Sequence, residues 1–126
     1  MNIKELYQAI GGDYDEVLTR LLGKDSMVIR YAKRFSEDPA YGQLENAVRE
    51  NDPDAVFHAV HTLKGVAATL GFTRLFQVSS SLTELVRRNA SGDLPAAYSQ
   101  AAVLSAFEAV KTEYANTVDA LEKLGE

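Results

Sequence analysis

The sequence has no cysteine among its 126 residues, which excludes disulfides, zinc–thiolate sites and cysteine nucleophiles together. It also has no apolar run long enough to cross a membrane, and its first residues, MNIKELYQAI, lack the basic-then-apolar order of a signal peptide. Positive charge is not in excess, because the formal net charge is −5. This balance argues against general binding to nucleic acid or to an anionic membrane surface. We therefore expect a cytoplasmic protein that acts on neither.

The composition is that of a folded globular protein. Apolar residues make up 46% and charged residues 25% of the chain, which is unlike the composition of a disordered segment. A chain of this length fits one ordinary domain, and no repeat, linker or low-complexity tract divides it. We therefore expect a single domain over residues 1–126, and a monomer.

Apolar residues recur at helical spacing along nearly the whole chain, and no segment alternates apolar and polar residues as a half-buried strand would. Between these segments lie short connections, which are typical of an antiparallel helical bundle. The sequence thus predicts an all-α fold, a four-helix bundle with short extra helices at the N-terminus. The expected helices cover residues 1–10, 13–23, 25–35, 40–51, 52–70 and 73–89, and the last one starts at Leu94 and has about thirty residues.

Helix-capping residues support several of these boundaries. Asp13 is a candidate N-cap for the second helix. Asp52 followed by Pro53 is a strong start signal, because proline suits the first position of a helix. That helix is expected to run to Leu70 and to end at Gly71. It contains both histidines of the chain.

The histidines lie in the segment HAVHTLKGVAATLG, residues 58–71. At about 100° per residue, the apolar side chains of this helix form one arc that must face the core, and His61 falls on the opposite side. Lys64 and Gly65 lie about one turn further on. A glycine inside a helix costs about 1 kcal/mol relative to alanine. Here it leaves the imidazole bare on one side, as a histidine reached by another protein's active site requires.

These residue types suit phosphoryl transfer. A neutral imidazole is a good nucleophile near pH 7, and a nearby ammonium such as Lys64 can offset the charge of a phosphoryl group. The chain has no glycine-rich phosphate loop of the GxxxxGK kind and no kinase-type nucleotide motif. Donor, acceptor and metal must then come from other proteins. The sequence therefore predicts a phosphocarrier without a nucleotide site of its own, and not an enzyme.

The segment HTLKGVAATLG resembles the motif of histidine-containing phosphotransfer (HPt) domains, and so do its flanks at residues 45–65 and 72–88. The resemblance implies a four-helix bundle whose exposed histidine relays phosphoryl groups to and from an aspartate on response-regulator receiver domains. It implies that His61 is phosphorylated, that Lys64 is its charge neighbour and that Gly65 gives clearance to the docking partner. A sensor or hybrid histidine kinase is the other implied partner. Mg²⁺ is expected on the receiver, and no cofactor on this chain.

Four other residues are candidates for a role near His61. Many members of the family have Gln or Glu at the position level with His61 on the next helix, where this chain has Thr83; Thr83 is the candidate to orient the ring. Phe57, His58 and Ala68 are candidates for binding the partner. His58 and His61 have a spacing that could hold a metal, but no third ligand is evident, so no metal site is expected.

Two other functions fit the sequence. The bundle could bind receiver domains as a scaffold without accepting phosphate, or it could be the phosphotransfer module of a larger histidine kinase. Met1, and an end shortly after the last expected helix, favour a free-standing protein.

Overall fold

The computed structural model describes residues 1–125, which contain helices and no strand. The all-α fold class is thereby confirmed. In chain order the elements are α1 (Ile3–Ala9), α2 (Tyr14–Arg20), α3 (Asp25–Arg34), the short 3-10 helix η1 (Phe35–Glu37), α4 (Ala40–Arg49), α5 (Pro53–Thr69), α6 (Thr73–Leu85) and α7 (Gln100–Glu122).

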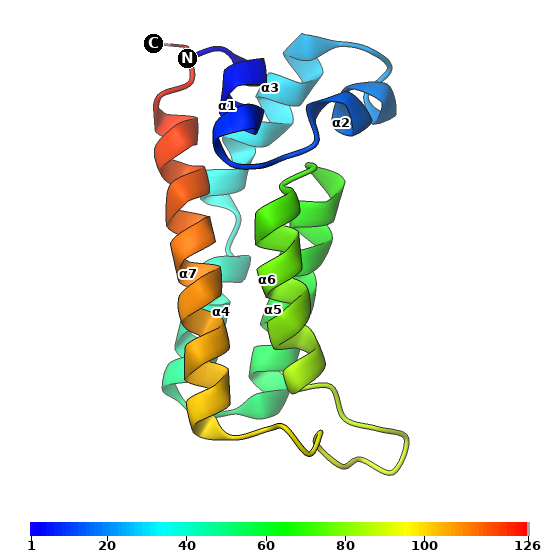
Figure 1. Ribbon diagram of the computed structural model, residues 1–126, viewed down its shortest axis with the longest axis vertical. Helices are drawn as coiled ribbons and strands as arrows, with labels where there is room; N and C mark the ends of the chain where they lie inside the picture. The colour runs from blue at the N-terminus through cyan, green and yellow to red at the C-terminus, as the bar shows by residue number, and fades with distance from the viewer. Residues whose placement is uncertain (126) are drawn as a thin grey trace.

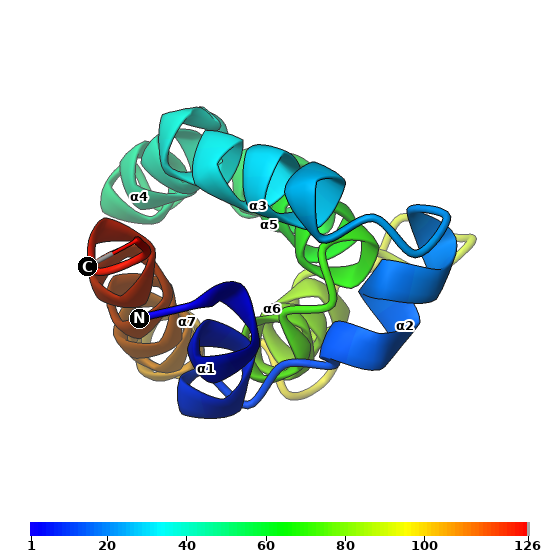
Figure 2. The same ribbon diagram turned by 90° about the horizontal axis from the view of Figure 1, so that it is seen from above.

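Helices α4 to α7 form an antiparallel four-helix bundle, and α1 to α3 cover one of its ends (Figure 1). Seen along the bundle axis, α4, α5, α6 and α7 follow one another around a ring (Figure 2). Helix α5 packs between α4 and α6, and α7 closes the ring by contacting α6 and α4. This is the predicted bundle with short extra N-terminal helices.

The capping signals of α5 act as the sequence indicated. The Asp52 side chain accepts hydrogen bonds from the backbone N–H groups of Asp54 and Ala55, both at 3.2 Å, and Pro53 is the first helical residue. At the other end Gly71 has a φ of 68°, the left-handed conformation that glycine adopts without strain. A Cβ at Gly71 would also overlap the Val17 side chain. The start and the end of α5 are therefore fixed by local chemistry.

Two predicted boundaries near the other end of the bundle are wrong. The last helix begins at Gln100 and not at Leu94, and it has 23 residues. Ser99 caps it by accepting a hydrogen bond from the Ala102 N–H at 3.0 Å, and the residues before it form a turn in which the Tyr98 N–H donates to the Pro95 carbonyl oxygen at 3.0 Å. Helix α6 ends at Leu85, so the basic pair at 87 and 88 lies beyond it.

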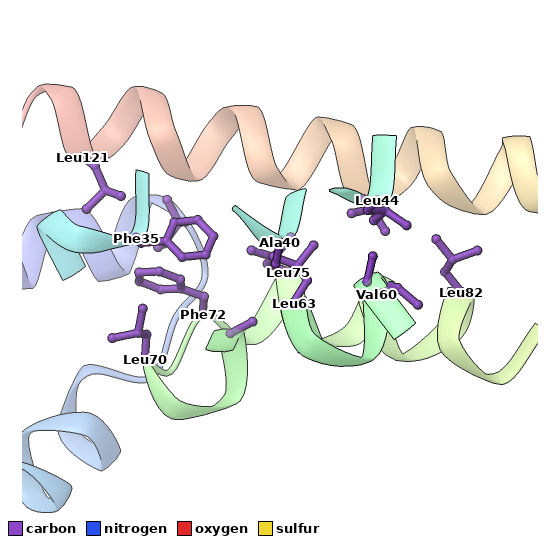
Figure 3. Packing of buried hydrophobic residues seen from close by; sticks show 14 of the residues in the cluster. Phe35, Ala40, Leu44, Val60, Leu63, Leu70, Phe72, Leu75, Leu82 and Leu121 are labelled. Carbon is purple, nitrogen blue, oxygen red and sulfur yellow. The ribbon is translucent and has the colours of Figure 1, made fainter. Parts of the chain in front are cut away.

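The core fixes which face of α5 points outward. Figure 3 shows side chains from α4, α5, α6 and α7 meeting along the bundle axis, with Phe35 and Phe72 at the end nearest the N-terminal helices. These two rings meet edge to face, with centroids 5.1 Å apart. From α5, Val60 and Leu63 are buried in this core. The residues on the opposite side of α5 are consequently left to solvent.

The N-terminal helices hold the C-terminal end of α5. The buried Tyr7 hydroxyl donates a hydrogen bond to the Leu70 carbonyl oxygen at 2.5 Å. Burial raises the pKa of Tyr7, which keeps this proton in place. From α2, Arg20 donates to the carbonyl oxygens of Ala68, at 3.1 Å, and Thr69. Free carbonyls at a helix end attract cations, so Arg20 satisfies groups that the helix itself leaves open.

We expect Tyr7→Phe to lower the free energy of unfolding by about 1–3 kcal/mol, because the buried Leu70 carbonyl loses its donor. Chemical denaturation followed by circular dichroism measures the change. The matched control is Tyr31→Phe on α3, an exposed tyrosine whose hydroxyl has no hydrogen bond within residues 1–125. It should change stability by less than about 0.5 kcal/mol. Equal effects of the two variants would contradict this role for Tyr7.

Candidate functional site

His61 lies near the middle of α5 and is exposed, as the helical periodicity predicted. Its neighbour Val60 and the residue Leu63 face the core and are almost completely buried. Since the core fixes the rotation of α5 about its axis, the exposure of His61 follows from the apolar pattern of the helix.

The His61 imidazole stacks on the ring of Phe57. The two ring centroids are 5.5 Å apart and the ring planes differ by 11°. Phe57 lies four residues earlier on the same helix, the spacing at which helical side chains meet. Within residues 1–125, neither ring nitrogen of His61 makes a hydrogen bond. The ring is thus held by its face, while the nitrogen lone pair at its edge is available.

Thr83 does not orient the His61 ring, so the prediction from the sequence that it does is wrong. The Thr83 side chain is completely buried, whereas His61 is exposed. Its hydroxyl donates a hydrogen bond of 2.7 Å to the Ser79 carbonyl oxygen, one turn back on α6. Threonine on a helix commonly makes this bond to its own backbone. The hydroxyl proton is therefore used inside α6.

Arg87, from the segment after α6, lies over the ring of Phe57. The Arg87 Cζ atom is 5.2 Å from the centroid of that ring, within cation–π range. Arg87 Nε donates to both carboxylate oxygens of Glu84, at 3.2 and 2.9 Å. This hydrogen bond is the main reason that the pKa of Glu84 is lowered, and the charges of Arg87 and Lys64 add to the effect.

The sequence reasoning missed both Arg87 and Glu84. A signal for Arg87 was present, because the antiparallel pairing that brings position 83 level with His61 also brings position 87 level with Phe57. It was overlooked because α6 was expected to continue through residue 87. Basic residues are common at the C-terminus of a helix, so Arg87 needed no other explanation.

Lys64 is half-buried, one turn after His61. Its Nζ lies 5.8 Å from the centroid of the Phe76 ring, so its side chain extends toward α6. Its charge helps to lower the pKa of Glu84. Lys64 and Arg87 thus place two positive charges near the Glu84 carboxylate, on the side of α5 that faces α6.

Gly65 borders open space. A Cβ at this position would have no atom of another residue within 4 Å. Gly65 also lines a groove of about 480 Å³ between α5 and the segment formed by α3 and η1. The hydroxyls of Thr62 and Thr69, which also line the groove, donate to the carbonyl oxygens of His58 and Gly65, both at 3.0 Å, so their protons are used within α5. The lining residues are Tyr31, Arg34, Phe35, Asp38, Thr62, Gly65, Val66, Thr69 and Leu70.

The remaining sequence candidates lie apart from one another. His58 is exposed and precedes His61 by one turn. Ala68 is exposed too, but it lines a separate hollow of about 250 Å³ with Glu16 of α2 and Phe76 of α6. Within residues 1–125 no group of three or more side chains is placed to hold a metal ion.

The site thus consists of a histidine exposed in mid-helix, with a lysine and a glycine that borders open space one turn further on. A family model for the Hpt domain matches residues 38–123, and the chain belongs to this family. Members act in two-component signalling, where they carry phosphoryl groups on histidine and interact with receiver domains and histidine kinases; they are carriers and not enzymes. Helices α1 to α3 lie outside the match.

The comparisons with curated proteins and with solved structures gave no significant match. Among residues 1–125, no helix combines the length and the apolar character needed to cross a membrane.

Proposed function

We propose that this protein is a phosphorelay carrier that accepts a phosphoryl group on His61 from the aspartate of one receiver domain and passes it to the aspartate of another. One observation carries the proposal: the His61 imidazole is exposed in mid-helix, with its nitrogens free of hydrogen bonds within residues 1–125, beside the open space at Gly65. A nucleophile on an exposed helix face suits a reaction in which a partner protein brings the phosphoryl group and the rest of the active site.

The transfer step needs few groups from this chain. The unprotonated ring nitrogen of His61 attacks the phosphorus of the receiver's aspartyl phosphate, and a P–N bond forms. The P–O bond to the aspartate breaks, and its electron pair stays on the carboxylate that leaves. Mg²⁺ belongs to the receiver and offsets charge on the phosphoryl oxygens. Lys64 contributes positive charge one turn from His61. Onward transfer is the reverse step with a second receiver.

The groove beside Gly65 is the docking surface for the receiver. It is continuous with the phosphorylation site, because Gly65 lies one turn from His61 and also lines the groove. Its far wall is formed by Tyr31 and Arg34, which belong to α3 and so lie outside the family match. A receiver closing over His61 would contact this wall. The N-terminal helices therefore contribute to the choice of receiver.

The experiment that tests the proposal uses a panel of receiver domains phosphorylated with a radioactive label, with Mg²⁺. At least one should transfer label to this protein, and the label should be acid-labile and base-stable, as a phosphoramidate is. ATP alone should give no label, because the chain has no nucleotide-binding motif. A receiver that binds without transferring label would favour the scaffold, and labelling from ATP alone would contradict a carrier.

A further inference from the structure

The stacking of His61 on Phe57 bears on how the imidazole is oriented for the transfer step. The lone pair of an imidazole nitrogen lies in the plane of the ring, so in-line attack requires that this plane contain the phosphorus atom. A ring that turns freely about its side-chain torsions meets this condition only part of the time. A group on the protein that holds the plane would raise this fraction, and Thr83, committed to Ser79, is not that group.

We propose that Phe57 is a positioning residue that sets the plane of the His61 imidazole by stacking, an inference that rests on the proposed function of His61. The ring planes lie within 11° of parallel and the ring centroids are 5.5 Å apart, an arrangement that is kept only while the imidazole holds this orientation. Stacking uses the face of the imidazole and leaves its edge free. A hydrogen bond to a ring nitrogen would instead occupy one of the two edge atoms.

Phe57 is itself held in place from two sides. It is half-buried and packs against the hydrophobic core. Arg87 lies over its ring at 5.2 Å, and Glu84 fixes the Arg87 guanidinium through two short contacts of 3.2 and 2.9 Å. The next residue, Arg88, is tied to Asp54 on α5 at 2.7 Å. The segment after α6 is thereby anchored to α5 next to Phe57, which keeps Arg87 over the ring.

Positioning and docking predict different kinetics for a change at Phe57. A docking residue contributes affinity, so its loss raises the receiver concentration needed for half-maximal transfer. A positioning residue acts after the receiver is bound, so its loss lowers the transfer rate at saturating receiver. The aromatic pair is worth roughly tenfold in the population of the stacked orientation.

The test compares Phe57→Leu, which is apolar but cannot stack, with Phe57→Tyr, which keeps the ring. We expect Phe57→Leu to transfer about tenfold more slowly at saturating receiver with unchanged receiver affinity, and Phe57→Tyr to stay within about twofold of the wild type. Thermal melting checks the fold of both, and Phe57→Met is a second apolar variant without a ring. Proton NMR of the free protein gives an independent readout, because the stacked ring shifts the His61 ring-proton resonances upfield and Phe57→Leu should remove this shift.

The positioning role of Phe57 and the acceptor role of His61 predict different failures. An unchanged saturating rate in Phe57→Leu, or a loss that appears only as weaker receiver binding, would overturn the positioning role and leave His61 as the acceptor. A wild type that takes no label from any receiver would overturn the proposed function. The NMR comparison needs no receiver, and an unchanged His61 shift in Phe57→Leu would contradict the stacking on its own.

Discussion

Replacement of His61 by glutamine is expected to abolish labelling from a phosphorylated receiver. Glutamine has a similar reach but no nucleophilic nitrogen, so no P–N bond can form. The position is exposed on α5, and glutamine is a good helix former, so the fold should be kept. Label incorporation is measured beside circular dichroism of the same sample, and the expected signal is the background of the assay.

The matched control is His58→Gln, one turn earlier on the same helix. His58 is also exposed, but it has no ring contact like that between Phe57 and His61 within residues 1–125. At least part of the labelling should therefore survive in this variant. Labelling that persists in His61→Gln and disappears in His58→Gln would overturn the site assignment.

Gly65→Gln should reduce transfer by about 100-fold without unfolding the protein. The imidazole and the phosphoryl group must come to near contact, and a small displacement of the docked receiver costs about this factor. Open space around the missing Cβ means that the glutamine meets nothing on this chain. Gly65→Ala should be neutral for folding, or stabilising by up to about 1 kcal/mol, because alanine favours the helix.

Gly42 provides a control for the replacement of a helical glycine by glutamine. It also lies inside a helix, α4, and a Cβ there would likewise meet nothing within 4 Å. Gly42→Gln should therefore leave both the transfer rate and the melting temperature close to those of the wild type. Equal transfer by Gly65→Gln and Gly42→Gln would refute the clearance argument, and unfolding of Gly65→Gln alone would show that Gly65 is a packing residue.

Much of the bundle and the exposure of His61 could be predicted because the signals are local. The apolar arc of α5 fixes the outward face, and Asp52, Pro53 and Gly71 mark its ends through their own backbone preferences. The boundary of α7 was missed because Leu94, Ala96 and Ala97 are good helix formers and proline is tolerated in a first turn, although Ser99 is itself a preferred N-cap residue.

The contacts around His61 were harder to predict from the sequence, because several side chains there have more than one possible hydrogen-bond or ring-contact partner. Thr83 could bond across to α5 or back to its own helix, and its short side chain selects the carbonyl of Ser79. The contact of Arg87 with Phe57 depends on where α6 ends. The hydrogen bonds from Tyr7 and Arg20 to the end of α5 join residues about 50 or more positions apart, and no periodicity reports such pairs.

The central claim, that His61 forms the bond to phosphorus, is tested most directly by NMR of protein labelled with ¹⁵N in histidine. The chain has two histidines, so the imidazole spectrum is simple, and the loss of signals in His61→Gln assigns it. After phosphorylation by a receiver and removal of that receiver, the account predicts a phosphorus–nitrogen coupling on a ring nitrogen of His61. A coupling on His58, or phosphorus bound to the protein without coupling to either imidazole, would contradict it.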